Sequence, residues 1–274
     1  MKALRNRYQT NPDTIRIILM RIGFIGTGSI TTAIVTGLCK EDTTSYQIWV
    51  SARNKENALS LENTYDQVSI GASNQTVVDN ADLLFLAFLP GMEDDILSTL
   101  VLRPDQVVVS LLAGVSVSKI KSFTAPAKGV VRAIPLPCTA LRTGPVVMFP
   151  GNDHVFEIFS QIGSVLIPEQ EDHLSIFSMI TALMAPFYAL TDTVAAWGES
   201  KGLDRAQAAA YTASMFKALA LIAETVPQGN IHGLVADSMT PGGLNETAMN
   251  ELSGSGGFSN IVEALNIVSA KFNK

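Results

Sequence analysis

The chain has 274 residues, of which 47% are hydrophobic and 16% are charged, and its formal net charge is −6. This composition excludes a disordered chain, and the acidic balance provides no overall basic surface for nucleic acid. Two cysteines are too few for a disulfide framework and the three histidines are far apart, so no metal site is expected.

The first 19 residues carry basic side chains but neither a long apolar block nor a small-residue cleavage site, so they do not fit a secretory signal. The segment Met20-Arg21-Ile22-Gly23 has the character of a chain start, and residues 1–19 are therefore expected to be an extension. No apolar run is expected to reach the about 18 residues that a membrane span needs. We predict a cytoplasmic protein that contacts neither membrane nor nucleic acid.

Between residues 20 and 168, short runs rich in β-branched residues alternate with helix-like segments. The expected strands are 21–25, 47–50, 68–70, 83–88, 107–112, 130–134 and 146–149, followed by a helix at 152–161 and a short edge strand at 164–167. Such alternation is typical of βαβ units and of a parallel sheet that is buried on both faces. The fold class predicted for this domain is α/β, a doubly wound parallel sheet of Rossmann type.

From residue 169 to residue 274 no strand-like run remains, and an all-helical domain is expected. A long helix over 171–201 should kink at Pro186, and Asp204 should cap the next helix, 205–226. Further helices are expected from 230 to 272, with breaks at 241–243 and 254–257. The stretch 206–223 is apolar around most of its circumference and must be covered on most sides. We therefore predict a homodimer through this domain, or a larger homo-oligomer.

The stretch Ile22–Ala33 predicts a strand, a tight glycine turn and the start of a helix. Gly26 permits the turn, Gly28 lets the backbone approach a pyrophosphate, and the helix start supplies free N–H groups to the phosphates. The third small position of this dinucleotide fingerprint is occupied by Thr31. The cofactor-binding residues expected here are Gly26, Thr27, Gly28, Ser29 and Ile30, and an ordinary glycine turn is the alternative.

The end of the second strand indicates which cofactor is bound. NAD sites usually place an acid there for the ribose 2′-hydroxyl, but the sequence is Val50-Ser51-Ala52-Arg53-Asn54. Ser51 can donate to a 2′-phosphate and Arg53 can neutralise it, with Asn54 at the same site. NADP(H) is therefore the preferred cofactor and NAD(H) the alternative. A surface Arg53 at a helix start would weaken this interpretation.

Several further stretches resemble the pyrroline-5-carboxylate reductase family, whose members reduce a cyclic imine to proline with NAD(P)H. The matching stretches are Leu84–Pro90, Ser110–Ser116, Val131–Pro135, Gly202–Ala208, Asp237–Gly243 and Gly256–Phe258. The most specific of them is Asp237-Ser238-Met239-Thr240-Pro241-Gly242-Gly243. The resemblance adds Ala87, Leu89, Pro90, Ala113 and Gly114 to the expected cofactor contacts.

The resemblance also implies a substrate loop that leads into a helix. Pro241, Gly242 and Gly243 would bind the substrate, with backbone N–H groups on its carboxylate. Thr240 and Asn245 would be the catalytic residues that hydrogen-bond the substrate, and Tyr188 would line the pocket. Thr240 could instead cap a helix, and Tyr188 could instead be a core aromatic residue.

The substrate side departs from the family pattern more than the cofactor side does. Asn245 stands where the family usually has a hydroxyl residue, Leu136 replaces an Asn, Leu89 replaces a Lys, and Thr181–Pro186 replaces a Ser/Gly-rich run. We predict NADPH-dependent reduction of a cyclic imine, with 1-pyrroline-5-carboxylate the first choice. A different imine, or NADPH binding without turnover, stays open. A β-hydroxyacid dehydrogenase is disfavoured, because no Lys in the helical half is followed four residues later by Asn.

Overall fold

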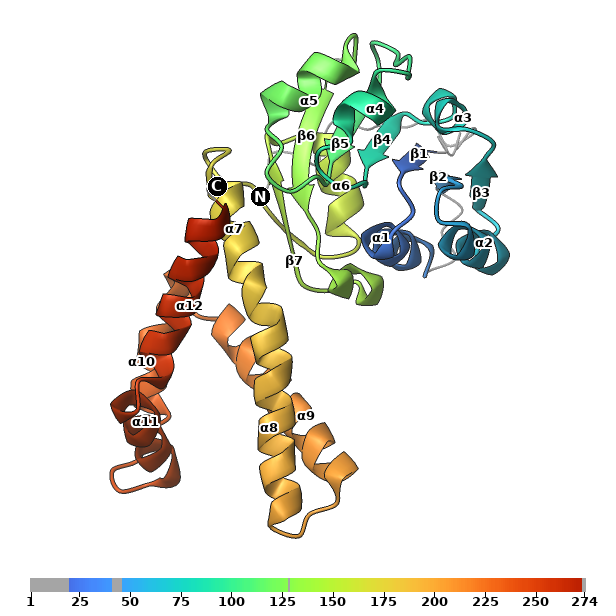
Figure 1. Cartoon of the computed structure of the whole chain (residues 1–274). Helices are drawn as coiled ribbons and strands as arrows, with labels where there is room; N and C mark the ends of the chain where they lie inside the picture. The colour runs from blue at the N-terminus through green and yellow to red at the C-terminus, as the bar shows by residue number, and fades with distance from the viewer. Residues whose placement is uncertain (1–19, 41–45, 128, 273–274) are drawn as a thin grey trace, which may run out of the picture. The chain divides into compact units, whose positions relative to one another are not determined.

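The computed structural model describes residues 20–40, 46–127 and 129–272, and the predicted extension 1–19 lies outside them (Figure 1). The described residues divide into two compact units, one up to Ser175 and one from Ile176 onward. The segment around Glu171 belongs to the first unit because Glu171 is bonded to residues of that unit. Its Oε1 accepts hydrogen bonds from Arg132 Nη1 at 2.7 Å and from Val117 N at 2.8 Å.

The first unit is built on a sheet of eight strands in the order β3-β2-β1-β4-β5-β6-β7-β8. The strands are β1 (Met20–Ile25), β2 (Tyr46–Ser51), β3 (Val68–Gly71), β4 (Leu83–Leu86), β5 (Val107–Ser110), β6 (Gly129–Ile134), β7 (Pro145–Phe149) and β8 (Ser164–Leu166). All neighbouring pairs are parallel except β6 and β7, which are antiparallel. The sheet is thus mostly parallel, as the sequence predicts, and the antiparallel β6–β7 pair was not anticipated. The connection over 135–144, which contains the short 3-10 helix η1 (Pro137–Leu141), is too short for a parallel crossover.

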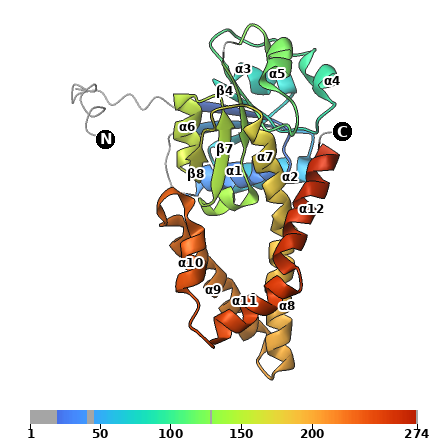
Figure 2. The ribbon, with the colours of Figure 1, turned by 90° about the vertical axis from the view of Figure 1, so that its left-hand side faces the viewer.

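Helices cover both faces of this sheet (Figure 2). One face packs against α1 (Ser29–Cys39), α2 (Lys55–Thr64) and α6 (Asp153–Ser160), and the other against α3 (Asn74–Asp79), α4 (Glu93–Leu97) and α5 (Val117–Thr124). Phe24 and Phe85 stack on the first face with ring centroids 4.6 Å apart, and Phe159 of α6 meets Phe85 edge-on. Because both faces are buried, the strands are nearly continuous apolar runs, as the sequence predicts.

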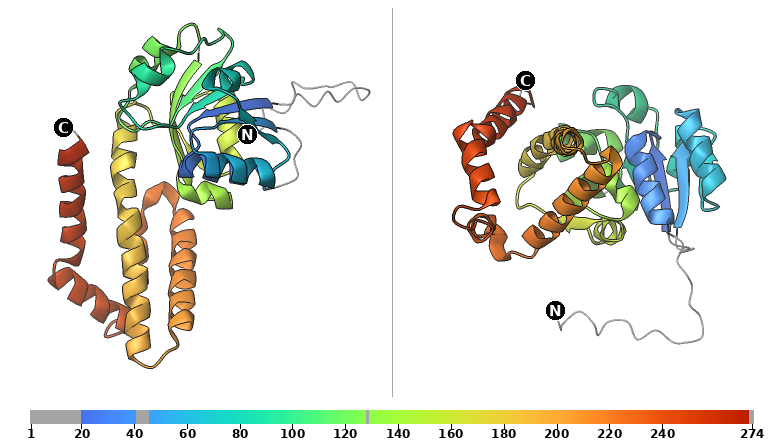
Figure 3. Two further views of the ribbon diagram at one scale, coloured as in Figure 1. Left: turned by 45° about the vertical axis from the view of Figure 1, so that its right-hand side comes forward. Right: turned by 90° about the horizontal axis from the view of Figure 1, so that it is seen from below.

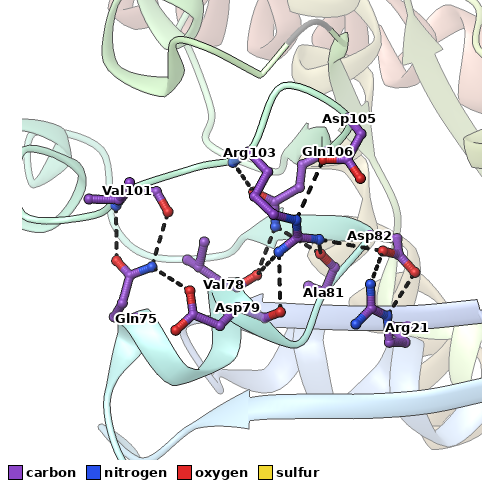
Figure 4. A network of polar contacts seen from close by, with 10 residues as sticks. All are labelled: Arg21, Gln75, Val78, Asp79, Ala81, Asp82, Val101, Arg103, Asp105 and Gln106. Atoms are coloured by element: carbon purple, nitrogen blue, oxygen red, sulfur yellow. Dashed lines mark hydrogen bonds and ion pairs between the residues drawn. The ribbon is translucent and has the colours of Figure 1, made fainter.

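A polar network ties the loops that enter β4 and β5 (Figure 4). Gln106 is 1% exposed, and its Nε2 donates to the carbonyls of Val78 at 2.7 Å and Ala81 at 2.8 Å. Its Oε1 accepts from Arg103 N at 2.7 Å. Asp82, just before β4, accepts from Arg21 Nε at 3.0 Å. This network lies at the amino ends of the parallel strands, opposite the edge where α/β sheets bind ligands, so its role is structural.

Helix α7 (His173–Ile180) contains the boundary between the two units. It continues through η2 (Thr181–Leu183) into α8 (Met184–Ser200) of the second unit. The remaining elements are α9 (Arg205–Glu224), η3 (Pro227–Gly229), α10 (Ile231–Asp237), α11 (Leu244–Gly254) and α12 (Gly257–Phe272). The expected long helix is thus interrupted by a 3-10 turn at Thr181–Leu183. The cause is Pro186, which has no N–H to donate to the carbonyl of residue 182.

Helices α8 and α9 lie side by side and antiparallel within this unit (Figure 3). Small residues line their contact, where Ala195, Gly198, Ala208 and Thr212 are buried. As predicted, Asp204 caps α9, and its Oδ1 accepts from Gln207 N at 3.0 Å. The helix breaks expected at 241–243 and 254–257 are also present, on either side of α11.

The second unit exposes much of its apolar surface. Its exposed large side chains include Phe187, Tyr188, Trp197, Tyr211, Leu219, Ile222, Leu244, Phe258 and Val262. The stretch His173–Ser200 reaches a mean hydropathy of 1.6 over an 18-residue window of which only 6% is buried within the chain. By length and composition alone this helix is sufficient to cross a membrane, so the expectation that no such stretch exists was wrong. Such a surface needs an apolar cover of some kind.

Candidate cofactor site

The turn between β1 and α1 has the backbone that the sequence predicts. Gly26 has a φ of +102°, and a Cβ there would lie 2.2 Å from the carbonyl oxygen of Ala87, so only glycine fits. The helix begins at Ser29 after Gly28, with no side-chain cap and no acid in the first turn. Its first N–H groups are therefore available to an anion. A Cβ on Gly28 would meet nothing within 4 Å, which leaves room for a ligand beside the backbone.

Thr31, the irregular third position of the fingerprint, has a structural use. Its side chain is fully buried, and its Oγ1 donates to the carbonyl of Gly26 at 2.8 Å. A hydroxyl therefore braces the turn where the usual fingerprint has a small residue for close helix–strand packing. The departure from the motif does not disturb the turn.

Ser51, predicted to contact a 2′-phosphate, holds the glycine turn instead. The residue is 2% exposed, and its Oγ accepts a hydrogen bond from Gly26 N at 2.8 Å. Thr27 Oγ1 donates to the carbonyl of Ser51 at 2.6 Å. The hydroxyl is shielded from a ligand, so the expectation for Ser51 is corrected. The last residue of β2 thus holds the Gly26 turn and is not among the residues that line the cleft described next.

Asn57 adds a third tie that sequence reasoning missed. Its Nδ2 donates to the carbonyl of Thr27 at 2.9 Å, and its own N–H bonds Oδ1 of Asn54, the cap of α2, at 3.2 Å. The start of α2 and the glycine turn are therefore held together by side chains. An Asn in a first helical turn has many uses, and no pattern in the sequence marked this one.

A cleft of about 740 Å³ opens at the carboxyl ends of β1, β2 and β4. It is lined by Gly26, Thr27, Gly28, Ser29, Ile30, Arg53, Asn54, Lys55, Ala87, Phe88, Leu89 and Leu111. Nine of these were predicted cofactor contacts, whereas Lys55, Phe88 and Leu111 were not. Arg53 is an exposed residue just before α2, as its alternative role requires, but it also lines the cleft together with the exposed Lys55. Arg53 Nη1 lies 3.4 Å from Met92 Sδ. A pocket of this size is suited to a cofactor or another small molecule.

A second cleft, of about 430 Å³, opens at the carboxyl ends of β4 and β5. It is lined by Pro90, Gly91, Glu93, Ala113, Gly114, Val115, Ser116 and Lys119. It thus contains the predicted contacts Pro90, Ala113 and Gly114. Beside β1 the sheet order changes direction, from β2 on one side to β4 on the other, and dinucleotides bind across this point. The two clefts lie one after the other along the carboxyl ends of the strands, on the course that a bound dinucleotide would take.

The residues of the larger cleft fit NADP(H). The segment after β2 offers the cations Arg53 and Lys55, and no acid stands among Ser51–Lys55 to bind a free ribose 2′-hydroxyl. Two cations beside a helix start suit a phosphate monoester. The uncapped start of α1 suits the pyrophosphate that both nicotinamide cofactors carry.

The predicted substrate loop connects α10 to α11 and uses several of its own donors. Gly242 N donates to Glu246 Oε2 at 2.7 Å, and Gly243 N donates to the carbonyl of Thr240 at 2.8 Å. Asn245 Nδ2 donates to the carbonyl of Ser238 at 2.9 Å. The helix cap of α11 is Gly243, so the alternative that Thr240 caps this helix was wrong.

Tyr188 lies on α8 and is 65% exposed, with its ring edge-on to Phe187. It is therefore not a core aromatic residue within the chain, and the described contacts do not join it to the substrate loop. Its pocket role stays a prediction. Thr240, Pro241 and Gly242 are likewise exposed.

The two cysteines lie on neither cleft. Burial raises the pKa of the Cys39 thiol to about 11 and also raises the pKa of Cys138. Both thiols are free and stay protonated near neutral pH, so neither is a nucleophile there.

Comparisons with known proteins agree with this geometry. Residues 21–114 match a family model described as NADP oxidoreductase coenzyme F420-dependent, and residues 171–273 match one for pyrroline-5-carboxylate reductase dimerisation. Pyrroline-5-carboxylate reductase 1 of Bacillus spizizenii is 27% identical over 89% of this chain and 86% of its own. The structure of 1-pyrroline-5-carboxylate reductase from Streptococcus pyogenes has a TM-score of 0.79 at 23% identity, covering 92% of this chain and 98% of that one. The pyrroline carboxylate reductase of Plasmodium falciparum, solved with NADP bound, has a TM-score of 0.76 at 16% identity, covering 93% and 97%.

The fold and the clefts define a Rossmann-type dinucleotide-binding protein with a separate helical domain. The helical domain matches a dimerisation model over nearly its whole length. The two family models and the relatives together support the pyrroline-5-carboxylate reductase family, as the sequence predicts, and the predicted fold class is confirmed.

Proposed function

We propose that this chain reduces 1-pyrroline-5-carboxylate to L-proline with NADPH, as a step of proline biosynthesis. The choice of NADPH rests on the larger cleft, which is lined by the Gly26 turn, Arg53 and Lys55. No acidic residue stands among Ser51–Lys55, at the end of β2. The substrate is supported by relatives of this name that match across most of the chain.

Bound NADPH supplies a hydride, which is accepted by the carbon of the C=N bond while the nitrogen retains the proton of its iminium form. The chain's own residues bind and orient. The first N–H groups of α1 hold the pyrophosphate, and Arg53 with Lys55 holds the 2′-phosphate. Because a protonated imine accepts hydride readily, the site needs placement more than a strong acid.

The loop Thr240–Gly243 and Asn245 form the proposed substrate-binding segment. A substrate carboxylate competes there with Glu246 for the N–H of Gly242. The N–H groups at the start of α11 have no side-chain cap and provide further donors. In this proposal Asn245 hydrogen-bonds the substrate and does not deliver a proton, because an amide is not a comparable acid.

A second candidate is reduction of a cyclic imine that lacks the carboxylate. It is favoured by the same loop, because Glu246 already places a carboxylate on Gly242 N and Asn245 is engaged with Ser238. Binding of NADPH without turnover is the non-catalytic alternative.

We further propose that the active form is a cytoplasmic homodimer, with a second copy covering the apolar surface of α8, α9 and α12. The match to a dimerisation model and the exposed aromatic residues of these helices support a protein cover over a lipid one. Free cysteines are typical of a reducing compartment.

A substrate panel tests the proposal. NADPH consumption is measured with 1-pyrroline-5-carboxylate, a piperideine carboxylate and 1-pyrroline side by side. The proposal predicts the highest kcat/KM for 1-pyrroline-5-carboxylate. A preference for 1-pyrroline would support the second candidate, and NADPH binding with no turnover on any imine would support the non-catalytic one.

A further inference from the structure

Glu93 is a buried carboxylate on the wall of the second cleft. The residue is 5% exposed, and its Oε2 accepts from Gly91 N at 3.0 Å. No ion pair among the described residues includes it. An ionised carboxylate can accept about four hydrogen bonds, and a buried one is costly without positive charge nearby. Glu93 therefore keeps acceptor capacity at this cleft and has no ion-pair partner among the described residues.

No described ion pair joins Glu93 to the cations near it. Arg53 is exposed, and its Nη1 lies 3.4 Å from Sδ of Met92, the residue before Glu93. Lys119 lines the same cleft, but its Nζ lies over the Phe123 ring, 5.4 Å from the centroid. Asp94 and Asp95 follow on the same helix and are exposed, so water screens them. Glu93 is the one carboxylate among the residues that line the two described clefts.

The second cleft lies where the proposed cofactor would place its nicotinamide end, at the carboxyl ends of β4 and β5. The oxidised and reduced cofactors carry the same phosphates and differ by one positive charge on the nicotinamide ring. A fixed negative charge on the wall acts strongly on that difference, because it is poorly screened where solvent is excluded.

We propose that Glu93 is an electrostatic determinant of the redox state that this site prefers, stabilising the cationic ring of NADP⁺ over the neutral ring of NADPH. The inference rests on the proposed cofactor. As the hydride leaves with its electron pair, the ring changes from neutral to cationic and the iminium becomes a neutral amine. The Glu93 carboxylate lowers the cost of the first of these changes, which is the change that the binding of the two cofactor forms reports.

The test is the ratio of the Kd for NADP⁺ to the Kd for NADPH, measured by calorimetry on the full chain at fixed salt. Glu93→Gln keeps the shape and an acceptor for Gly91 N but removes the charge. Glu93→Gln should raise the Kd for NADP⁺ by about fivefold or more and leave the Kd for NADPH within about twofold of the wild-type value. Asp94→Asn, the same loss of charge at the exposed neighbour, should leave the ratio unchanged. Binding is read directly, so no imine substrate enters the test.

A second variant covers the case in which Glu93→Gln does not fold. Lys119→Glu changes an exposed side chain on the same cleft and should shift the ratio toward tighter NADP⁺. A ratio that is unmoved in the variants that fold, or equal weakening of both cofactors by Glu93→Gln, overturns the inference while the proposed function stands. A wild-type chain that binds neither cofactor would refute the proposed function and this inference together.

Discussion

Replacing Ser51 by Ala tests the role that the structure gives to the end of β2. The Ser51 hydroxyl accepts from Gly26 N at 2.8 Å, and the residue is 2% exposed. Ser51→Ala leaves a buried N–H without its partner, which costs about 1–3 kcal/mol. The Thr27 hydroxyl keeps its bond to the backbone carbonyl of residue 51, so the turn loses one tie and retains another.

The cost should appear in cofactor affinity, because the Gly26 turn holds the pyrophosphate that NADPH and NADH share. If about 1 kcal/mol of it reduces the preorganisation of the turn, the Kd for each cofactor rises about fivefold, and the ratio of the two is unchanged. Titration of cofactor fluorescence measures both constants. Ser60→Ala, at an exposed position of α2, is the matched control. A weakening confined to NADPH would refute the reasoning and make Ser51 the 2′-phosphate contact that the sequence suggested.

Three further predictions concern the turn, the cations and the scaffold. Arg53→Ala should raise the KM for NADPH about tenfold, and Lys55→Ala should raise it about threefold. The KM for NADH should be unchanged in both variants. Equal changes in KM for both cofactors would argue against a 2′-phosphate role. Gly28→Ala should leave the melting temperature within about 2 °C of the wild-type value, since the new Cβ meets no atom within 4 Å. It should raise the Kd for both cofactors at least about tenfold. An unchanged Kd would mean that the pyrophosphate binds elsewhere. Gln106→Ala should destabilise by about 2–3 kcal/mol in urea unfolding, because it breaks two buried hydrogen bonds and a third that is partly buried. Asp105→Ala, whose side chain is 73% exposed, should cost less than about 0.5 kcal/mol, and similar costs for the two would refute the assignment.

Most of the fold could be predicted because hydrophobic periodicity and turn residues act locally. Each expected strand appears, within two residues at either end, and Asp204 caps α9 as its side chain suggests. The antiparallel β7 could have been predicted from the short connection over 135–144, which leaves no room for a crossover helix. The pairing of Arg132 with Glu171 joins residues 39 apart in sequence, and no local pattern foretells it.

The candidate site was predictable as a set of positions but not as a set of roles. The glycine turn and Arg53 lie on the cleft, where their residue types suggested they would be. Ser51 has the chemistry of a phosphate contact, yet its position in the strand buries it against the turn. Likewise, the sequence offers Gly242 as a free donor, whereas Glu246 four residues later occupies its N–H. Tertiary packing sets the direction in which a side chain points, and the residue type alone does not specify that direction.

The most direct test of the central claim follows the hydride itself. The chain is supplied with 1-pyrroline-5-carboxylate and NADPH deuterated at the transferable position, and the product is examined by mass spectrometry and chiral chromatography. Our account predicts L-proline carrying a single deuterium on the former imine carbon, formed in step with NADPH consumption. Recovery of unreacted substrate with NADPH bound, or of proline without deuterium, would contradict it.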